Sequence, residues 1–289
     1  MNIILIILVF GVIIFFHELG HFIVAKMNHI TVKEFSMGLG PKLFSFNKKE
    51  TQYSLRLIPL GGYCMMLSED EEENENDENS FDKKSIWARM AVVLAGPFMN
   101  IVIAFIFSVV IIHFCGTDPA TIGRVYSDEL AQESDYADIA KEFGGDYPAA
   151  KAGIQDGDTV LKIGGSSIKN FRELQIYLEI YGDGSPIDLT LKRTDGEVYD
   201  TTVYPVKTSA GYKIGIISSG YKLPENFGEL MKYSAYEVRY WVKATFLSLK
   251  LIVTRQVSSD QVSGPVGVAK SMNDTFNEAA KVDVLTVLL

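Results

Sequence analysis

Hydrophobic residues are concentrated in two long runs within the first 115 residues. Residues 2–25 are mainly apolar around the polar island His17-Glu18-Leu19-Gly20-His21. Residues 90–115 are mainly apolar but contain Asn100 and an interruption at Gly96-Pro97. About 20 apolar residues in a helix cross the hydrocarbon core of a bilayer. The pattern therefore predicts two transmembrane helices.

The first run could instead be a cleavable signal peptide. No positive charge precedes it, and no small-residue cleavage site follows it, although signal peptides carry both. Ionisable groups inside a membrane segment are costly and mark functional sites. We therefore expect the first helix to be retained.

Between the two runs, residues 31–67 show alternating apolar positions that predict short strands or hairpins. Glycine and proline clusters at Gly38–Pro41 and Pro59–Gly62 predict turns. The acidic run of residues 69–79 repels itself and predicts a solvated loop.

Residues 117–217 read as a small soluble domain of mostly strands. Asp195-Gly196 favours a hairpin turn, and residues 171–180 have helical spacing. The strand-like segments are 122–125, 159–163, 187–191 and 198–203.

Residues 235–253 are a weaker candidate for a third span, because they carry Arg239, Lys243 and Lys250. An amphipathic helix lying on the membrane surface is the alternative. The last six residues, 284–289, resemble the start of another apolar helix.

The charge of the chain limits its possible binding partners, and the distribution of Lys and Arg suggests its orientation in the membrane. The chain of 289 residues is 47% hydrophobic and has a net charge of −9, so nucleic acid is excluded as a partner. The loop of residues 26–89 carries many Lys and Arg residues, whereas none precedes the first span. The positive-inside rule places this loop, with its acidic run, in the cytoplasm and residues 117–217 outside.

Cys64 and Cys115 are too few for a disulfide framework.

The polar island is an H-E-x-x-H motif, the pattern of zinc metalloproteases. Residues four apart share one face of a helix, so His17 and His21 can hold one zinc ion. Glu18 would then act as general base for a zinc-bound water. Gly20 leaves the helix surface beside His21 open, so a substrate backbone could approach there.

These motifs occur in an order that resembles the site-2 protease family of intramembrane zinc metalloproteases, in its bacterial PDZ-containing branch. The resemblance covers nearly the whole chain. It rests on Phe16–Phe22, Phe35–Pro41, Ile58–Tyr63, Ala95–Asn100, Pro148–Asp158 and Ser263–Gly267.

The resemblance implies a multi-pass α-helical membrane protein with a membrane-associated β-hairpin region and an inserted α/β PDZ-like domain. The expected divisions are a protease core of residues 1–116, a PDZ-like domain of residues 117–217, and a segment of residues 229–289. By the same resemblance, the enzyme cuts single-pass transmembrane proteins in the plasma membrane, such as anti-sigma factors or remnant signal peptides. Asn100, Gly61 and Gly62 would position the substrate or the zinc site. Asn100 could instead be a polar residue of helix packing.

The chain departs from the family pattern in two places. The third zinc ligand of the family is an Asp in a Leu-Asp-Gly motif, which does not occur here and is expected beyond Leu289. We therefore expect the 289 residues alone to bind zinc weakly and to be inactive. Asp283 is the nearest substitute, in a Val-Asp-Val setting. In addition, an acidic insertion at residues 127–147 lies near the expected peptide groove of the PDZ-like domain.

Three other functions compete with the protease. The first is a membrane-anchored PDZ adaptor with a vestigial metal site. The zinc content of the full-length protein would distinguish it from the protease. A transporter should show repeated halves, and none is seen. A soluble zinc protease with a signal peptide fails, because the metal motif lies within the apolar run itself.

Overall fold

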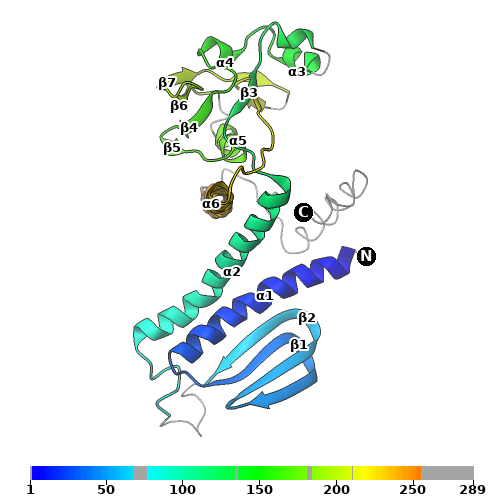
Figure 1. Cartoon of the computed structure of the whole chain (residues 1–289), viewed down its shortest axis with the longest axis vertical. Helices are drawn as coiled ribbons and strands as arrows, with labels where there is room; N and C mark the ends of the chain where they lie inside the picture. The colour runs from blue at the N-terminus through cyan, green and yellow to red at the C-terminus, as the bar shows by residue number, and fades with distance from the viewer. Residues whose placement is uncertain (1, 68–76, 134–135, 181–183, 210, 255–289) are drawn as a thin grey trace. The chain divides into compact units, whose positions relative to one another are not determined.

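The computed structural model describes residues 2–67, 77–133, 136–180, 184–209 and 211–254, without the side chains of residues 2–6 and 60. The described chain divides into two units, one that contains residues up to Phe107 and one that contains those from Ser108 onward (Figure 1). Most of the acidic run, the segment Ser263–Gly267 and Asp283 lie outside the described residues.

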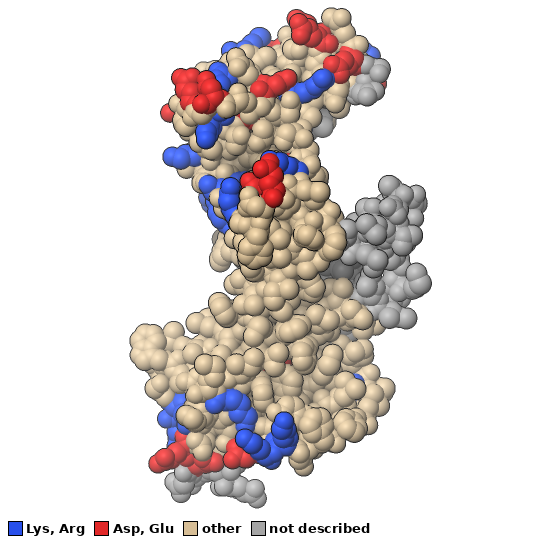
Figure 2. Space-filling model, viewed as in Figure 1, with Lys and Arg blue, Asp and Glu red and all other residues tan. Residues whose placement is uncertain are grey.

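Two apolar helices, α1 (Asn2–Met27) and α2 (Ile86–Cys115), occupy the positions of the predicted spans. Among the described helices, these two are long and apolar enough to cross a membrane, with mean hydropathies of 2.1 and 2.5. The hydroxyl of Ser85 accepts a hydrogen bond from the N–H of Ala88 at the start of α2. On the face shown in Figure 2, the surface over α1 and α2 is almost free of charged side chains.

The interruption of the apolar run at Gly96-Pro97 does not end the helix, because α2 continues through Pro97. A proline inside a helix removes one backbone donor, but it can be accommodated within a long apolar helix. Gly96 and Pro97 therefore lie on a continuous helix.

The region between the helices is a sheet of two long, bent strands, β1 (Val32–Lys48) and β2 (Thr51–Met66), joined at Lys49-Glu50. The turns predicted at Gly38–Pro41 and Pro59–Gly62 are wrong, because both clusters lie inside these strands. Gly38, Gly40 and Gly61 adopt positive φ values of 88°, 84° and 112°. Glycine tolerates this backbone without a steric cost, so the clusters bend the strands rather than end them.

The bends fold β2 around β1. Phe35 and Ser36 each have two partners on β2, one on either side: Cys64 and Tyr53 for Phe35, and Tyr63 and Ser54 for Ser36. The segment Gly62–Met66, here called the edge arm, pairs with the start of β1. Within the described residues, no other strand pairs with the edge arm, so its outer edge is a sheet edge.

A buried ionic cluster ties the bent strands together. The guanidinium of Arg56 donates to Glu34 Oε1 at 2.9 Å, to Ser36 Oγ at 2.9 Å and to the Gly40 carbonyl at 2.8 Å. It also contacts the hydroxyl of Tyr63 beside the edge arm's first residue. Burial raises the pKa of Glu34, but hydrogen bonds from Ser54 and Arg56 outweigh it and lower the pKa to about 2. The Arg56 side chain, on β2, therefore links three residues of β1 around the bend.

The second unit contains a β-rich domain whose elements follow the predicted pattern closely. The helix α5 (Phe171–Ile180) and the strands β3 (Ile122–Val125), β4 (Thr159–Ile163) and β7 (Val198–Val203) have the predicted bounds. The remaining elements are η2 (Leu130–Gln132), α3 (Ala137–Glu142), α4 (Pro148–Lys151), β5 (Ser166–Ser167), β6 (Ile187–Lys192), β8 (Val206–Thr208), β9 (Gly211–Lys213) and β10 (Ile216–Ser218).

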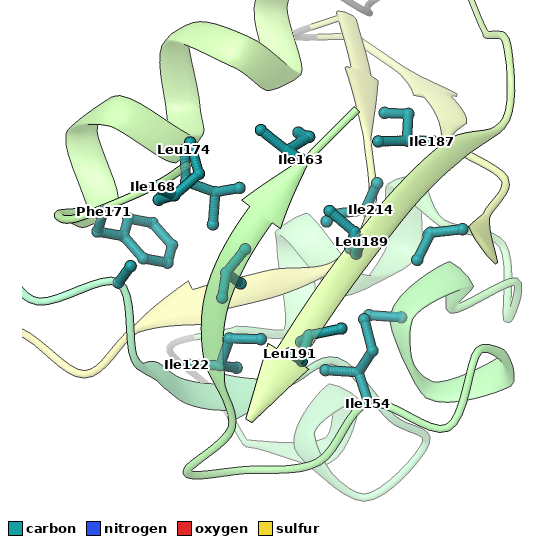
Figure 3. Close-up of a cluster of buried hydrophobic side chains, with 14 residues drawn as sticks. Ile122, Ile154, Ile163, Ile168, Phe171, Leu174, Ile187, Leu189, Leu191 and Ile214 are labelled. Atoms are coloured by element: carbon teal, nitrogen blue, oxygen red, sulfur yellow. The ribbon is translucent and has the colours of Figure 1, made fainter. Parts of the chain in front are cut away.

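The core of this domain lies between the four-stranded sheet β5-β4-β6-β7 and the helix α5. Ile163 of β4, Leu174 of α5 and Leu189 and Leu191 of β6 are almost completely buried (Figure 3). Strands β10 and β3 form a separate antiparallel pair. Inward apolar residues at every second position of β6 produce this packing.

A buried carboxylate holds one end of the sheet. Asp158 accepts hydrogen bonds from Tyr199 Oη at 2.6 Å, Arg193 Nη1 at 2.9 Å and the Gln155 N–H at 2.9 Å. Burial and the neighbouring carboxylate raise the pKa of Tyr199. The turn before β4 is thereby joined to the hairpin of β6 and β7.

The acidic insertion of residues 127–147 contains η2 and α3 and has a small core of its own around Phe143 and Leu130. It borders a cavity of about 430 Å³ that lies beside α5 and the start of β10. Ile139, Glu142 and Phe143 of the insertion form one side of this cavity. The insertion therefore shapes the hollow next to α5.

The segment predicted as a third span or amphipathic helix is one helix, α6 (Phe227–Val253). One side of α6 carries Arg239 and Lys243, which form ion pairs with the buried Glu173 of α5. The apolar side chains of Phe246 and Leu249 are 69% and 52% exposed. The helix is amphipathic, and its charged side packs on the β-rich domain.

Candidate metal centre and active site

His17 and His21 meet on one face of α1, one helical turn apart. Their Nε2 atoms lie 3.2 Å apart, and their rings are nearly perpendicular with centroids 4.9 Å apart. The spacing of four residues in a helix brings the two rings together. Two nitrogen ligands therefore point at one location.

The backbone of α2 closes one side of this pair. A Cβ atom on Gly96 would lie 2.4 Å from Nε2 of His21 and 2.7 Å from Nε2 of His17, so no side chain fits there. The expectation that Gly20 leaves room for a substrate is wrong. A Cβ on Gly20 would lie 2.4 Å from the carbonyl oxygen of Ala95, so α2 fills that space.

A backbone carbonyl orients the second histidine. His21 Nδ1 lies 2.7 Å from the carbonyl oxygen of Val92, which can only accept, so Nδ1 carries the proton. The lone pair of this imidazole is then on Nε2, the atom that faces His17. Metal-binding histidines use this arrangement, in which the other ring nitrogen donates to a carbonyl or carboxylate.

Asn100 contacts the first histidine. Its amide nitrogen lies 3.1 Å from His17 Nδ1, while its amide oxygen is buried without a hydrogen-bond partner. Turning the amide by 180° places the oxygen opposite Nδ1, where it accepts the Nδ1 proton and gains a partner. That orientation leaves the lone pair of His17 on Nε2. Asn100 thus lies where it can set the tautomer of His17.

Glu18 faces the sheet rather than α2. A Cβ on Gly62 would lie 3.3 Å from Cγ of Glu18 and 3.7 Å from Ile14, so the first residue of the edge arm passes directly over the carboxylate side chain. Gly61 lies elsewhere, because its Cβ would collide with Leu39 at 2.7 Å. The structure therefore brings Glu18, His17, His21, Asn100 and Gly62 together, but not Gly61.

The two histidines fit a zinc ion in spacing and chemistry. For zinc–nitrogen bonds of about 2.0–2.1 Å, tetrahedral geometry places two ligand nitrogens about 3.3–3.4 Å apart. The Nε2 atoms are 3.2 Å apart, and both can present lone pairs to the same location. Within the described part of the chain, no third His, Cys, Asp or Glu completes a group of three. His17 and His21 are the residues that would hold the metal.

Sequence reasoning missed two features of the site, the space reserved at Gly96 and the carbonyl of Val92. Gly96 belongs to a motif noted in the sequence, but its role depends on the packing of α2 against α1. Val92 orients His21 through its backbone carbonyl. Every residue type carries this group, so the sequence gives no signal for the contact.

Comparison with known proteins gives the family of the chain. The model of peptidase family M50 matches residues 5–289. A candidate zinc metalloprotease of Clostridium acetobutylicum is 36% identical over 271 residues, covering 93% of this chain and 73% of that protein. One of Clostridium perfringens is 37% identical over 292 residues, covering 100% of this chain and 78% of that protein. The zinc metalloprotease RasP of Geobacillus kaustophilus is 26% identical over 349 residues, covering 93% and 78%.

An H-E-x-x-H pair held between apolar helices defines a membrane-embedded metallopeptidase. The chain belongs to peptidase family M50, the site-2 proteases. Among solved structures, PDZ domains of SdrC-like proteins from Listeria monocytogenes and Listeria innocua are similar to part of it, at 19% and 18% identity. They cover 35% and 36% of this chain and 87% and 99% of those chains, with a TM-score of 0.26 in both cases.

Proposed function

We propose that this protein is an endopeptidase that hydrolyses peptide bonds within transmembrane segments of other membrane proteins. The observation that carries the proposal is the position of Glu18, the base of the metal motif, directly under Gly62 at an open sheet edge. A carboxylate beside a sheet edge to which a peptide could add supports a peptide-cleaving role. The flanking helices α1 and α2 are apolar enough to hold this site within a bilayer.

The edge arm explains how a transmembrane helix could be cut. Inside a helix, the backbone groups are hydrogen-bonded to one another and the peptide bond is shielded. A segment that unwinds and adds to the edge arm exchanges those hydrogen bonds for ladder hydrogen bonds. Its backbone would then lie beside Glu18.

Each group in the site has a distinct part in the chemistry. When bound, zinc supplies a Lewis acid that polarises the scissile carbonyl and acidifies water. The Glu18 carboxylate accepts the proton of the attacking water and passes it to the leaving amine. Val92 and Asn100 hold the two imidazoles in the tautomers that keep Nε2 available.

The same proposal includes a location and partners. The substrates would be single-pass membrane proteins, of the anti-sigma factor or signal-peptide-remnant type, in the plasma membrane. The Lys and Arg residues of the 26–89 loop favour a cytoplasmic loop and an external β-rich domain. The cavity beside α5 supports a second binding role for this domain, toward peptides.

The test is hydrolysis of a single-span reporter by the full-length protein with zinc, in detergent or lipid. Glu18→Gln keeps the two ligands and removes the base, so we expect zinc content to stay unchanged while cleavage falls by at least about 100-fold. His17→Ala and His21→Ala should lose both zinc and cleavage.

Undiminished cleavage by Glu18→Gln would overturn the mechanism. A wild-type protein that binds the reporter and zinc but never cuts would favour the alternative, a membrane-anchored adaptor with a vestigial metal site. A protein that binds zinc only weakly would point to a third ligand outside the described residues.

A further inference from the structure

A second cavity adjoins the metal site, and neither the motif nor the proposed chemistry uses it. Its volume is about 370 Å³. Apart from one imidazole and one thiol, its walls are apolar. They are formed by His21, Cys64, Met66, Leu67, Phe81, Val92 and Val93.

Two walls of the cavity belong to the edge arm. Side chains two residues apart point to the same face of a strand, so Cys64 shares the face of Gly62, which lies over Glu18. Met66 lines the same cavity as Cys64. Met65, between them, is 43% exposed and does not line it. The inward face of the edge arm therefore runs from Glu18 into this cavity.

A peptide added to the edge arm would follow the same alternation. Side chains of neighbouring strands that share a face are direct neighbours. Every second side chain of the added peptide would thus project on the side of Cys64 and Met66. Because a strand advances about 3.3 Å per residue, Cys64 lies about 7 Å along the arm from Gly62. The residue entering the cavity is then within about two positions of the bond beside Glu18.

We propose that this cavity is a specificity pocket that accepts one large apolar side chain of the substrate. The inference rests on the proposed peptidase function and names the residue class that this site selects. The buried Val92 and Leu67, 1% and 3% exposed, give the pocket an apolar floor that would exclude a charged side chain. Leucine, methionine or phenylalanine fits this chemistry, whereas alanine leaves the space unfilled.

The test uses the zinc-loaded full-length protein and a set of single-span reporters. Once mass spectrometry has located the cut bond, the three residues on either side are replaced singly by Ala, Leu, Phe and Asp. We expect one position at which Leu or Phe exceeds Ala by about tenfold or more in kcat/KM, with Asp poorest.

Filling the pocket should erase that preference. Cys64→Trp and Met66→Trp are expected to bring the ratio of Leu to Ala close to one at that position and to leave ratios at other positions unchanged. Met65→Trp is the matched control, because its side chain lies on the other face, and it should retain the wild-type ratio. The proposed pocket would be contradicted if wild type and both filled variants had equal Leu-to-Ala ratios of kcat/KM. A uniform loss of cleavage on all reporters would contradict it as well.

A second measurement does not depend on hydrolysis. Cys115→Ser leaves Cys64 as the only cysteine, and its modification by benzyl methanethiosulfonate can be followed by mass. A bound reporter with Leu at the selected position should slow modification several-fold more than the Ala reporter. If no reporter is cut, the same comparison is made with Leu placed in turn at each central position. Equal protection by every Leu and Ala reporter overturns the pocket, whereas an uncut but protecting Leu reporter supports it and overturns the proposed hydrolysis.

Discussion

Gly96 of α2 lies against His21 of α1 so closely that a methyl group on Gly96 would come within 2.4 Å of Nε2. Gly96→Ala should therefore push the imidazoles apart and weaken zinc binding by at least about tenfold. The measurement is a competitive zinc titration in detergent. Leu94→Ala, at a position of the same helix that is 60% exposed, is the control and should bind zinc as wild type does. Equal affinity in both variants would contradict the packing described.

Asn100 allows the tautomer of His17 to be tested directly. Asn100→Ala removes the partner of Nδ1, and we expect zinc affinity to fall about 10–100-fold. Asn100→Asp keeps an oxygen acceptor and should retain most of the affinity. Tighter zinc binding by both variants than by wild type would mean that the amide donates to Nδ1, which would leave Nε2 of His17 unable to bind the metal.

The ionic cluster of the sheet predicts a pH-dependent stability. Glu34 has a folded-state pKa of about 2, below its ordinary value of 4.5, because hydrogen bonds from Ser54 and Arg56 outweigh the effect of burial. Its contribution, about 3 kcal/mol, is complete above pH 4.5 and is lost as the pH falls toward 2. Thermal unfolding between pH 7 and pH 2.5 should show a steeper loss in wild type than in Glu34→Gln. Glu50→Gln, in the exposed turn, should behave as wild type.

The proposed orientation can be checked by labelling in intact cells. In a background without Cys64 and Cys115, Ser166→Cys in the β-rich domain should react with a membrane-impermeant maleimide. Lys48→Cys, beside the turn of the sheet, should react only after lysis. The reversed pattern would place the β-rich domain in the cytoplasm.

Residue patterns predicted regular elements well and bends poorly. Strand β4 and helix α5 have the predicted bounds, because half-buried elements repeat with a period of two or 3.6 residues. Gly38 and Gly61 were expected to end strands, yet they bend strands that continue, since a positive φ is compatible with either outcome.

The ligand pair followed from spacing alone, because four residues in a helix fix the relation of His17 to His21. The surroundings of the pair did not follow. The contact of Gly20 with Ala95 and the carbonyl of Val92 depend on how α2 approaches α1, which no local pattern encodes.

The buried carboxylate of Asp158 also orders events during synthesis. Its partners Arg193 and Tyr199 follow it by 35 and 41 residues. A chain emerging from the ribosome therefore exposes Asp158 well before either partner exists, and closing these loops has an entropic cost that only the finished sheet offsets. The β-rich domain cannot complete its fold until β7 has emerged, and a pause in translation before residue 187 would leave β4 without β6, which pairs with it through Thr159 and Lys192.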